Sequence, residues 1–255
     1  MRILVSNDDG IHAPGIAVCE AIAREISDDV WIVAPETDQS GVAHSLSLND
    51  PLRLREIDAK RYAVRGTPTD CVIMAIRHIM DIKPDLIISG VNRGQNVAED
   101  VTYSGTVAAA MEGTILGVPS FALSQAYGGD SVKNLHWDCG RVHAAKIIRK
   151  VLKEGIPPNV LVNINFPNCS PDDVKGVNVA VQGQRKQELL RIDERRDGRG
   201  NPYYWVAFGR GQSEPGHGTD LKALADKRIS ITPLRLDLTD EPTITRYAQA
   251  FDNWD

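Results

Sequence analysis

The chain has 255 residues, of which 42% are hydrophobic and 25% charged, and its formal net charge at pH 7 is −5. This composition is typical of a folded protein with one large domain, and the negative charge argues against a protein that binds a nucleic-acid polymer. No apolar run approaches the roughly 20 residues that cross a membrane, so we expect no membrane association. The four cysteines include no CxxC pair, which predicts reduced thiols. Only three apolar residues precede polar ones at the start of the chain, so we expect no signal peptide and a cytoplasmic protein.

The first segment of the chain is a short apolar run that ends at two adjacent carboxylates. Residues 3–5 are Ile-Leu-Val, which is typical of a buried parallel strand, and Asp8 and Asp9 follow before Gly10. Open α/β sheets bind ligands at the carboxyl ends of their strands. Two carboxylates this close repel each other, which a divalent cation would relieve. A solvated turn with acidic residues is the alternative interpretation.

A helix and a second strand follow, and their order predicts a parallel pair. Apolar residues at helical spacing predict a helix over 14–27, and residues 31–35 form a second buried strand. A strand, a helix and a strand in this order make a right-handed crossover with parallel strands. The polar segment 36–50, which contains Ser40, then leaves the sheet beside the carboxyl end of the first strand.

The next segment contains a small antiparallel pair and a helix with a clear start signal. Residues 52–57 and 61–64 alternate well enough for two antiparallel strands. A helix from residue 66 to about 80 begins with Thr67 before Pro68, a typical cap and first helical position. The free N–H groups of this helix start could hold an anion, although most helix starts are only capped.

A third buried strand, 85–90, leads into a loop with two asparagines, Asn92 and Asn96. After this loop comes a helix rich in alanine, which begins at the small residues 104–106. Small residues at a helix start let a phosphate group reach the backbone N–H groups, and hydroxyl groups add donors. An ordinary serine cap is the alternative interpretation.

The remaining elements complete one α/β domain, 1–255, with a core over about 1–182. Further strands at 118–124, 159–167, 176–181 and 228–234 and a helix at 136–154 are expected. Residues 183–255 have a different character, with a β-hairpin arm over 184–208, a Gly-rich loop over 209–219 and an amphipathic helix over 243–254.

The polar loops after the first three strands can meet at one edge of the sheet. They supply Asp8, Asp9, Ser40, Asn92 and the helix start at 104–106. Two carboxylates, a hydroxyl and an amide oxygen form a ligand set that suits Mg²⁺, Mn²⁺ or Ca²⁺. A divalent cation beside a helix N-terminus fits the hydrolysis of a phosphate ester.

Several motifs, in this order and spacing, resemble those of the SurE family of stationary-phase survival proteins. They are Asn7-Asp8-Asp9-Gly10, Ser40-Gly41, Gly66-Thr67-Pro68-Thr69-Asp70, Ser89-Gly90-Val91-Asn92-Arg93-Gly94-Gln95-Asn96, Tyr103-Ser104-Gly105-Thr106 with the alanines and Met111-Glu112-Gly113 after it, and Ser230-Ile231-Thr232-Pro233-Leu234.

The resemblance implies a phosphatase that needs one divalent cation per subunit, Mg²⁺ or Mn²⁺. Its substrates would be nucleoside 5′- and 3′-monophosphates, and short-chain polyphosphate in addition. The matching residues imply metal binding by Asp8, Asp9, Ser40 and Asn92, and phosphate binding by Asn96, Ser104, Gly105 and Thr106. Asp8 and Asp9 would also be the catalytic residues.

The family fold implied is a Rossmann-like three-layer α/β core with a mostly parallel sheet. Its C-terminal part exchanges between subunits, which implies a homodimer or homotetramer. The hairpin arm and the apolar side of the last helix agree with this, because both would otherwise expose aromatic surface.

Three alternative functions are compatible with some of the same residues. A nucleotide or phosphate sensor would bind without turnover. A response-regulator receiver also carries acids after its first strand, but this chain is too long for a bare receiver. A dinucleotide oxidoreductase is disfavoured because the Gly-rich fingerprint after the first strand is missing. For the phosphatase itself, attack by water and attack by Asp8 or Asp9 are both chemically open, and we favour water.

Overall fold

The computed structural model describes residues 1–128, 135–185, 190–208 and 215–252. Its strands are β1 (Arg2–Ser6), β2 (Asp29–Pro35), β3 (Arg53–Asp58), β4 (Arg61–Arg65), β5 (Leu86–Arg93), β6 (Ser120–Gln125), β7 (Val160–Phe166), β8 (Val177–Val179), β9 (Leu190–Arg196), β10 (Pro202–Phe208) and β11 (Ile229–Arg235). Its helices are α1 (Pro14–Ile26), α2 (Pro68–Met74), α3 (Asp100–Tyr103), α4 (Gly105–Ile115), α5 (Trp137–Glu154), α6 (Asp220–Ala225) and α7 (Glu241–Phe251).

One large sheet contains all of these strands except β9 and β10, in the order β3-β4-β2-β1-β5-β6-β7-β11-β8. The central strands β4, β2, β1, β5, β6 and β7 run parallel, as predicted from the alternation of strands and helices. The outer pairs β3–β4 and β7–β11 are antiparallel. The predicted α/β fold with a mostly parallel sheet is therefore confirmed.

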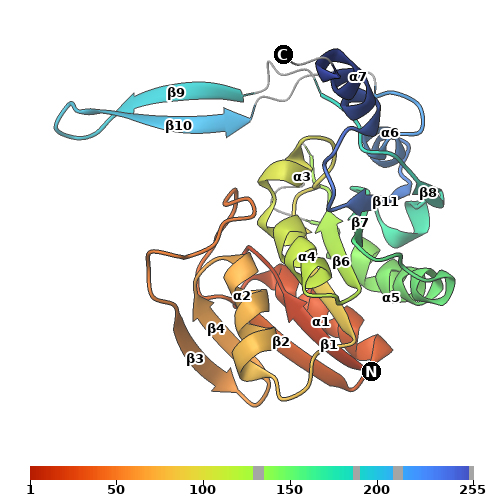
Figure 1. The fold of residues 1–255 in the computed structure, drawn as a ribbon. Coiled ribbons are helices and arrows are strands. Elements are labelled where there is room, and N and C mark those ends of the chain that lie inside the picture. The colour runs from red at the N-terminus through yellow and green to blue at the C-terminus, as the bar shows by residue number, and fades with distance from the viewer. Residues whose placement is uncertain (129–134, 186–189, 209–214, 253–255) are drawn as a thin grey trace.

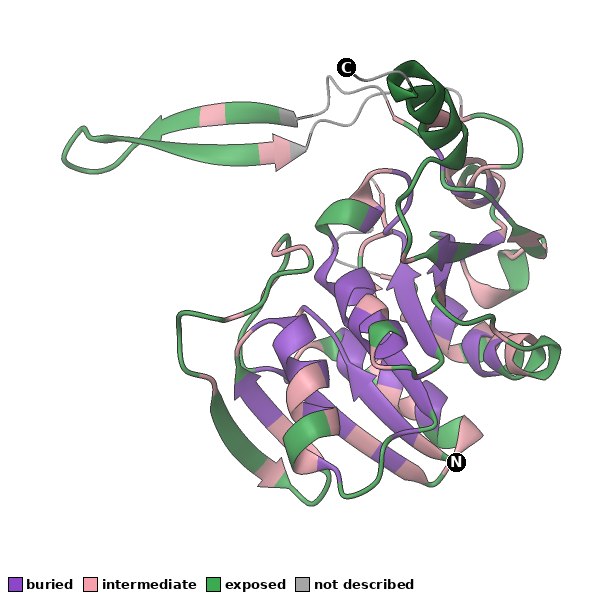
Figure 2. Ribbon diagram, viewed as in Figure 1, coloured by how far each residue is buried: buried purple, intermediate pink, exposed green. Residues whose placement is uncertain are grey.

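Helices cover both faces of this sheet, which gives three layers (Figure 1). Alternate residues of β1 show how the core divides between the faces. Ile3 and Val5 pack with α1 and α5, whereas Leu4 packs with α2 and α4 on the opposite face. Figure 2 shows that burial is concentrated in the central strands and in the helix faces against them. Among the described residues, no helix is both long and apolar enough to cross a membrane.

Local sequence signals explain the start of α2. The side chain of Thr67 accepts a hydrogen bond from the N–H of Asp70 at 3.1 Å, and the carboxylate of Asp70 accepts one from the N–H of Thr67 at 2.8 Å. This reciprocal pair is a capping box. The helix continues as a wider π-helical turn over Ala75–Ile79, so the predicted end near residue 80 is confirmed.

The predicted β-hairpin forms, and it has a short turn. Residues 193–196 belong to β9, and the turn lies at 197–201, where the N–H of Asp197 bonds to the carbonyl of Asn201. β9 and β10 form a separate two-stranded ribbon that projects from the body (Figure 1). Helix α6 was not expected, and residues 209–214 of the predicted Gly-rich loop lie outside the described residues.

The sheet order places β1 between β2 and β5, so the strands that follow β1 are added first on one side of it and later on the other. β1 leads through α1 to β2 on one side, and later segments continue from β5 on the other. Crevices form outside the carboxyl ends of such strands, where ligands bind in open α/β sheets. The residues after β1 and after β5 meet at this point.

Candidate active site

Asp8 lies directly against the first turn of α4. Its carboxylate accepts a 2.5 Å hydrogen bond from the hydroxyl of Thr106, and both side chains are buried. A Cβ atom on Gly105 would lie 2.8 Å from the Cβ of Asp8 and 3.2 Å from its Oδ2. Glycine at this position therefore allows the helix start and the carboxylate to come close together.

Burial raises the pKa of Asp8 to about 6, although the hydrogen bond from Thr106 acts in the opposite direction and the neighbouring Asp9 adds to the rise. Asp8 is only 3% exposed. The charged form of a carboxylate is disfavoured in such an environment unless a cation balances it. The site therefore favours a bound positive charge at neutral pH.

Asp9 is less buried than Asp8 and faces the end of β5. Its carboxylate accepts a hydrogen bond from the backbone N–H of Arg93 at 3.1 Å. Burial raises the pKa of Asp9, the bond from Arg93 opposes the rise, and the carboxylate of Asp38 adds to it. Three acidic groups from two loops thus influence one small region.

Ser40 reaches this region on the loop after β2. The N–H of Gln39 bonds to the carbonyl of Asp8 at 2.8 Å, which ties this loop to the end of β1. The hydroxyl of Ser40 donates to the carboxylate of Asp38 at 2.6 Å. Asp38 was not singled out from the sequence, because an acidic residue in a polar loop gives no signal of its own.

Asn92 lies near the end of β5, two residues further along the strand than expected, and Asn96 lies in the loop after it. The side-chain amide of Asn92 donates to the carbonyl of Gly94 at 2.9 Å, and its neighbour Arg93 contacts Asp9. The amide of Asn96 donates to the hydroxyl of Ser124 on β6 at 2.9 Å and is buried. Asn92 therefore directly precedes the residue whose N–H bonds to Asp9, while Asn96 belongs to a buried polar group toward β6 and β7.

Two asparagines of β7 complete that buried group. Asn163 and Asn165 both donate to the carbonyl of Asn96, at 2.8 and 3.1 Å, and Asn165 also accepts from its N–H at 2.8 Å. Sequence reasoning did not identify them as supporting residues. Their signal was present, because two asparagines interrupt an otherwise apolar strand.

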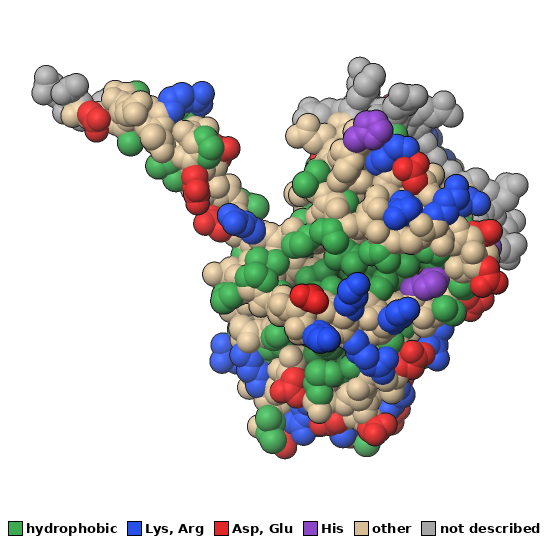
Figure 3. All heavy atoms as spheres, turned by 90° about the vertical axis from the view of Figure 1, so that its right-hand side faces the viewer, with side chains coloured by type: hydrophobic (Ala, Val, Ile, Leu, Met, Phe, Trp, Pro, Cys, Tyr) green, Lys and Arg blue, Asp and Glu red, His purple; other side chains and the backbone are tan. Residues whose placement is uncertain are grey.

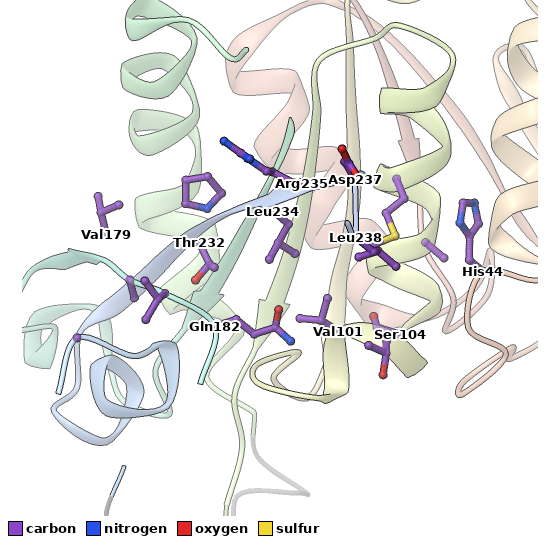
Figure 4. A pocket seen from close by; sticks show the side chains of 17 residues that line it. His44, Val101, Ser104, Val179, Gln182, Thr232, Leu234, Arg235, Asp237 and Leu238 are labelled. Atoms are coloured by element: carbon purple, nitrogen blue, oxygen red, sulfur yellow. The ribbon is translucent and has the colours of Figure 1, made fainter. Parts of the chain in front are cut away.

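Ser104 caps α4 and borders a large hollow. Its hydroxyl accepts a hydrogen bond from the N–H of Val107 at 3.1 Å, so the capping role is confirmed. The hollow has a volume of about 780 Å³ and is lined mostly by apolar side chains of α3, α4, β8 and β11. Figure 4 shows Ser104 at one end of this hollow and Val179 at the other, with His44 on a separate loop.

The donor set fits a hard divalent cation. Asp8, Asp9, Ser40 and Asn92 offer carboxylate, hydroxyl and amide oxygens, which suit Mg²⁺ or Mn²⁺. The described residues contain no group of three or more His, Cys, Asp or Glu side chains arranged for a metal ion. A cation here would therefore depend on neutral oxygens as well as the two carboxylates. The buried side-chain oxygen of Asn7, next to Asp8, has no hydrogen-bond partner, which leaves another polar atom near the carboxylates.

Comparison with known proteins identifies the family of this chain. The family model for survival protein SurE matches residues 3–189. A protein of Methylobacterium radiotolerans named 5′-nucleotidase SurE is 71% identical over 252 residues, which cover 98% of this chain and 99% of that protein. A protein with the same name from Methylorubrum extorquens is 68% identical, with the same coverage of both chains.

A solved structure shows the same fold. The crystal structure of the SurE protein from Aquifex aeolicus aligns with a TM-score of 0.82 at 40% sequence identity, and the alignment covers 98% of this chain and 99% of that chain. Family, length and fold thus agree over nearly the whole chain. The chain therefore belongs to the SurE family of survival proteins.

Proposed function

We propose that this chain is a 5′-nucleotidase that hydrolyses nucleoside monophosphates and needs a divalent cation. Relatives that share 68–71% of its residues are named 5′-nucleotidase SurE. The observation that carries the proposal is the contact of the buried Asp8 with Gly105 and Thr106 at the start of α4. This contact would join the proposed cation site to the proposed phosphate site.

The proposed ligands of the cation, one Mg²⁺ or Mn²⁺ per subunit, are Asp8, Asp9, Ser40 and Asn92. When bound, the cation would supply positive charge beside the phosphate group and make a water molecule more acidic. The protein contributes the placement of the four oxygen donors. Two hydrogen bonds fix the three segments relative to one another: the N–H of Gln39 donates to the carbonyl of Asp8, and the N–H of Arg93 donates to the carboxylate of Asp9.

The proposed phosphate site is the first turn of α4, with Ser104, Gly105 and Thr106, together with Asn96. The free N–H groups at a helix start attract an anion, and the small residues here leave its approach open. Donors that point at the phosphoryl oxygens stabilise the negative charge that shifts between them during the reaction. Thr106 would donate its backbone N–H to the phosphate, because the proton of its hydroxyl is already donated to Asp8.

In the proposed reaction a water molecule attacks phosphorus directly. Asp8 is held by Thr106 inside the protein, which makes it a poor nucleophile, whereas Asp9 is more exposed and can accept the proton of the water. The new P–O bond forms as the ester P–O bond breaks; the nucleoside oxygen leaves and takes up a proton from solvent, and Asp9 releases the proton that it accepted from the water. Labelled phosphate trapped on either aspartate would contradict this route.

The test is phosphate release from a panel of 5′- and 3′-nucleoside monophosphates and short polyphosphate, with EDTA, Mg²⁺ and Mn²⁺ in parallel. We expect release that depends on the cation, is lost in EDTA and is lost in Asp8→Ala. A folded protein that releases no phosphate under any of these conditions would contradict the proposal. Binding of AMP by such a protein would then support the phosphate-sensor alternative.

We propose further that a second copy of this chain covers its C-terminal part. α7 has no buried residue in the described part of the chain, and Ile244 and Tyr247 on it are more than half exposed. β8, at the edge of the large sheet, adds the exposed Val177 and Val179. Figure 3 shows hydrophobic side chains gathered in a band across this face of the body.

An isolated amphipathic helix of this length is marginal in water, and an exposed sheet edge tends to pair or be covered. A homodimer or homotetramer would bury both. Light scattering on the purified protein tests this, with Tyr247→Asp as the variant. We expect a wild-type mass at a multiple of 27.9 kDa and a shift toward the single-chain mass in the variant. A wild-type monomer would contradict it.

A further inference from the structure

The backbone of Asn96, a proposed phosphate-binding residue, is fixed by side chains of β7. Its N–H donates to the side-chain oxygen of Asn165 at 2.8 Å, and its carbonyl accepts from the amides of Asn163 and Asn165 at 2.8 and 3.1 Å. All three residues are buried. A backbone unit has one donor and an acceptor with two lone pairs, so these three bonds use all of them. Only the side-chain amide of Asn96 is left to bind a ligand.

The side-chain amide of Asn96 uses one of its two N–H groups within the protein. That group donates to the hydroxyl of Ser124 on β6 at 2.9 Å, and Ser124 is fully buried. Among the described residues, the second N–H of this amide has no acceptor. The two N–H bonds of a carboxamide lie in one plane at a fixed angle. The bond to Ser124 therefore sets the direction in which the second N–H points.

Ser124 lies on the face of the sheet that α4 covers, toward the first turn of that helix. Ala122, two residues earlier on β6, packs with Val107 of α4, and alternate residues of a strand share a face. A Cβ atom on Gly113, near the end of α4, would lie 2.5 Å from the hydroxyl of Ser120 at the start of β6. Helix and strand thus run in opposite directions, which brings the end of β6 toward the proposed phosphate site.

A second serine matches Ser124 in its surroundings but not in its contact with Asn96. Asn165 of β7 lies between the two, paired with Ser124 on one side and with Ser230 of β11 on the other. Both serines are fully buried. The hydroxyl of Ser230 lies 3.4 Å from that of Thr232, and it forms no hydrogen bond with Asn96 in the part of the chain that the structure describes. Ser230 is therefore a control for the loss of a buried hydroxyl.

We infer that Ser124 is a positioning residue of the proposed phosphate site, where its hydroxyl holds the amide of Asn96 with one N–H toward the phosphoryl oxygens. This role rests on the proposed function, which assigns Asn96 to the phosphate. An asparagine amide can otherwise rotate about its side-chain torsions. A bond to a fixed, buried hydroxyl removes this freedom before the phosphate binds, so less is lost on binding. Ser124 itself touches no substrate.

The first experiment measures the binding of inorganic phosphate without turnover. Phosphate is titrated calorimetrically into wild type, Ser124→Ala and Ser230→Ala, each in the presence of Mg²⁺. We expect Ser124→Ala to bind phosphate about fivefold more weakly, as for the loss of one hydrogen bond, and Ser230→Ala to stay within about twofold of wild type. Equal affinities of wild type and Ser124→Ala, or equal losses in the two variants, would overturn the inference.

The second experiment separates the KM for AMP from kcat, with Mn²⁺ and the same three proteins. The N–H of Asn96 holds the phosphoryl group in the bound substrate as well as during the reaction. We therefore expect Ser124→Ala to raise KM about fivefold and to change kcat less than about twofold. A smaller fraction of folded protein lowers kcat and leaves KM unchanged. A loss confined to kcat would thus show a purely structural role for Ser124 and contradict the inference.

The third experiment asks whether Ser124 acts through Asn96. The kcat/KM for AMP is measured for Ser124→Ala, Asn96→Ala and the double variant. A residue that acts only through another has no further effect once that other side chain is absent. We expect the double variant to stay within about twofold of Asn96→Ala. Losses that multiply in the double variant would show that Ser124 acts independently of Asn96, which would overturn the inference.

Failure of this inference and failure of the proposed function give different results. Wild type that binds phosphate but releases none from AMP contradicts the nucleotidase, while the phosphate affinities of the variants still decide the role of Ser124. Wild type that hydrolyses AMP, with an unchanged KM in Ser124→Ala, contradicts the inference alone. Melting temperatures show whether the variants are folded. Should Ser124→Ala not fold, Ser124→Cys replaces it, since a thiol of similar size is a weak acceptor and should also raise KM.

Discussion

The crevice at the end of β1 and the C-terminal part of the chain differ in where their side chains find partners. In the crevice, polar groups such as Asp8 and Thr106 are buried and bond to each other within one chain. In the β9–β10 ribbon, large aromatic residues such as Tyr204 and Trp205 are nearly 60% exposed. Figure 2 shows the contrast between the buried centre and the exposed ribbon and α7.

This difference separates two tasks of the molecule. The crevice has its donors and its close packing within a single chain, so a change there should alter chemistry and local stability. The ribbon and α7 have apolar surface without matching cover among the described residues, so a change there should alter assembly first. Substitutions in the two regions test this division, from the largest expected effect to the smallest.

The largest effect is expected for Asp8→Asn. The amide keeps the shape of the carboxylate but not its charge, so it should bind a divalent cation poorly and lower kcat about 10³-fold or more. The metal-free variant should be at least as stable as wild type, because a buried charge is removed. Phosphate release and thermal melting in EDTA measure the two effects. Activity within tenfold of wild type would refute the role of Asp8.

A pH dependence of the metal-free protein should follow from the same residue. The pKa of Asp8 is raised by burial from 3.8 to about 6, so the folded state holds its proton more tightly than the unfolded state does. The protonated Asp8 therefore contributes to the stability of the fold. This contribution is fully present below pH 4 and is lost as the pH rises through 6, so the free energy of unfolding falls by about 3 kcal/mol.

Urea unfolding in EDTA between pH 4 and 7 measures this change. Asp9 should add to it in the same direction, since burial raises its pKa too. Asp8→Asn supplies the control, since the variant should lack most of the dependence. A wild-type protein whose stability rises steadily over this pH range would show that folding does not raise the pKa of Asp8.

Gly105→Ala and Gly198→Ala compare the effect of an added methyl group in the crevice and in the hairpin arm. The added methyl group would lie 2.8 Å from Asp8 and 3.0 Å from Pro68, so a backbone or side-chain shift must follow. We expect a loss of about 1–3 kcal/mol in the free energy of unfolding, with a marked loss of activity. Gly198→Ala, in the hairpin turn, meets nothing within 4 Å and should stay within about 0.5 kcal/mol. Equal effects at the two sites would break the comparison.

The smallest effect is expected for His44→Ala. His44 contacts the buried Glu112 of α4 at 3.0 Å and anchors the loop that carries Ser40. In a double-mutant cycle with Glu112→Gln, we expect a coupling energy of about 1 kcal/mol between the two side chains. The exposed pair of Arg191 and Asp193 in the arm should contribute nothing measurable. A coupling energy near zero for His44 and Glu112 would show that the loop is held by its backbone bonds alone.

Much of this fold could be predicted because its signals are local. The strand ending at Asp8, the capped start of α2 and the serine cap of α4 depend on residues within a few positions of each other. Periodicity is less decisive in α5, where Val142 has helical spacing with the buried Ala145 and Ile148 but is itself 58% exposed. The buried face is formed by Cys139, Ala144 and Ile148, because the packing against α1 sets the rotation of the helix.

The residues of the candidate site also fall into two groups, those that local sequence signals indicated and those whose roles depend on distant contacts. The types of Asp8, Asp9, Ser40 and Asn92 and their positions at strand ends indicated a cation and a phosphate, and the structure brings their loops to one edge of the sheet. The contribution of Asp38 and the support of Asn96 by Ser124, Asn163 and Asn165 could not be inferred. These depend on contacts between segments far apart in the sequence.

The sequence by itself determined the order of the strands and of the longer helices, the helix caps and the chemical character of the crevice, because apolar periodicity, capping residues and donor types are properties of short segments. Only the tertiary structure decided that β11 enters the large sheet between β7 and β8, that Gly105 packs on Asp8 and that Ser124 bonds to Asn96. Strand pairing and close contact between distant segments depend on the packing of the whole chain, which no single segment encodes.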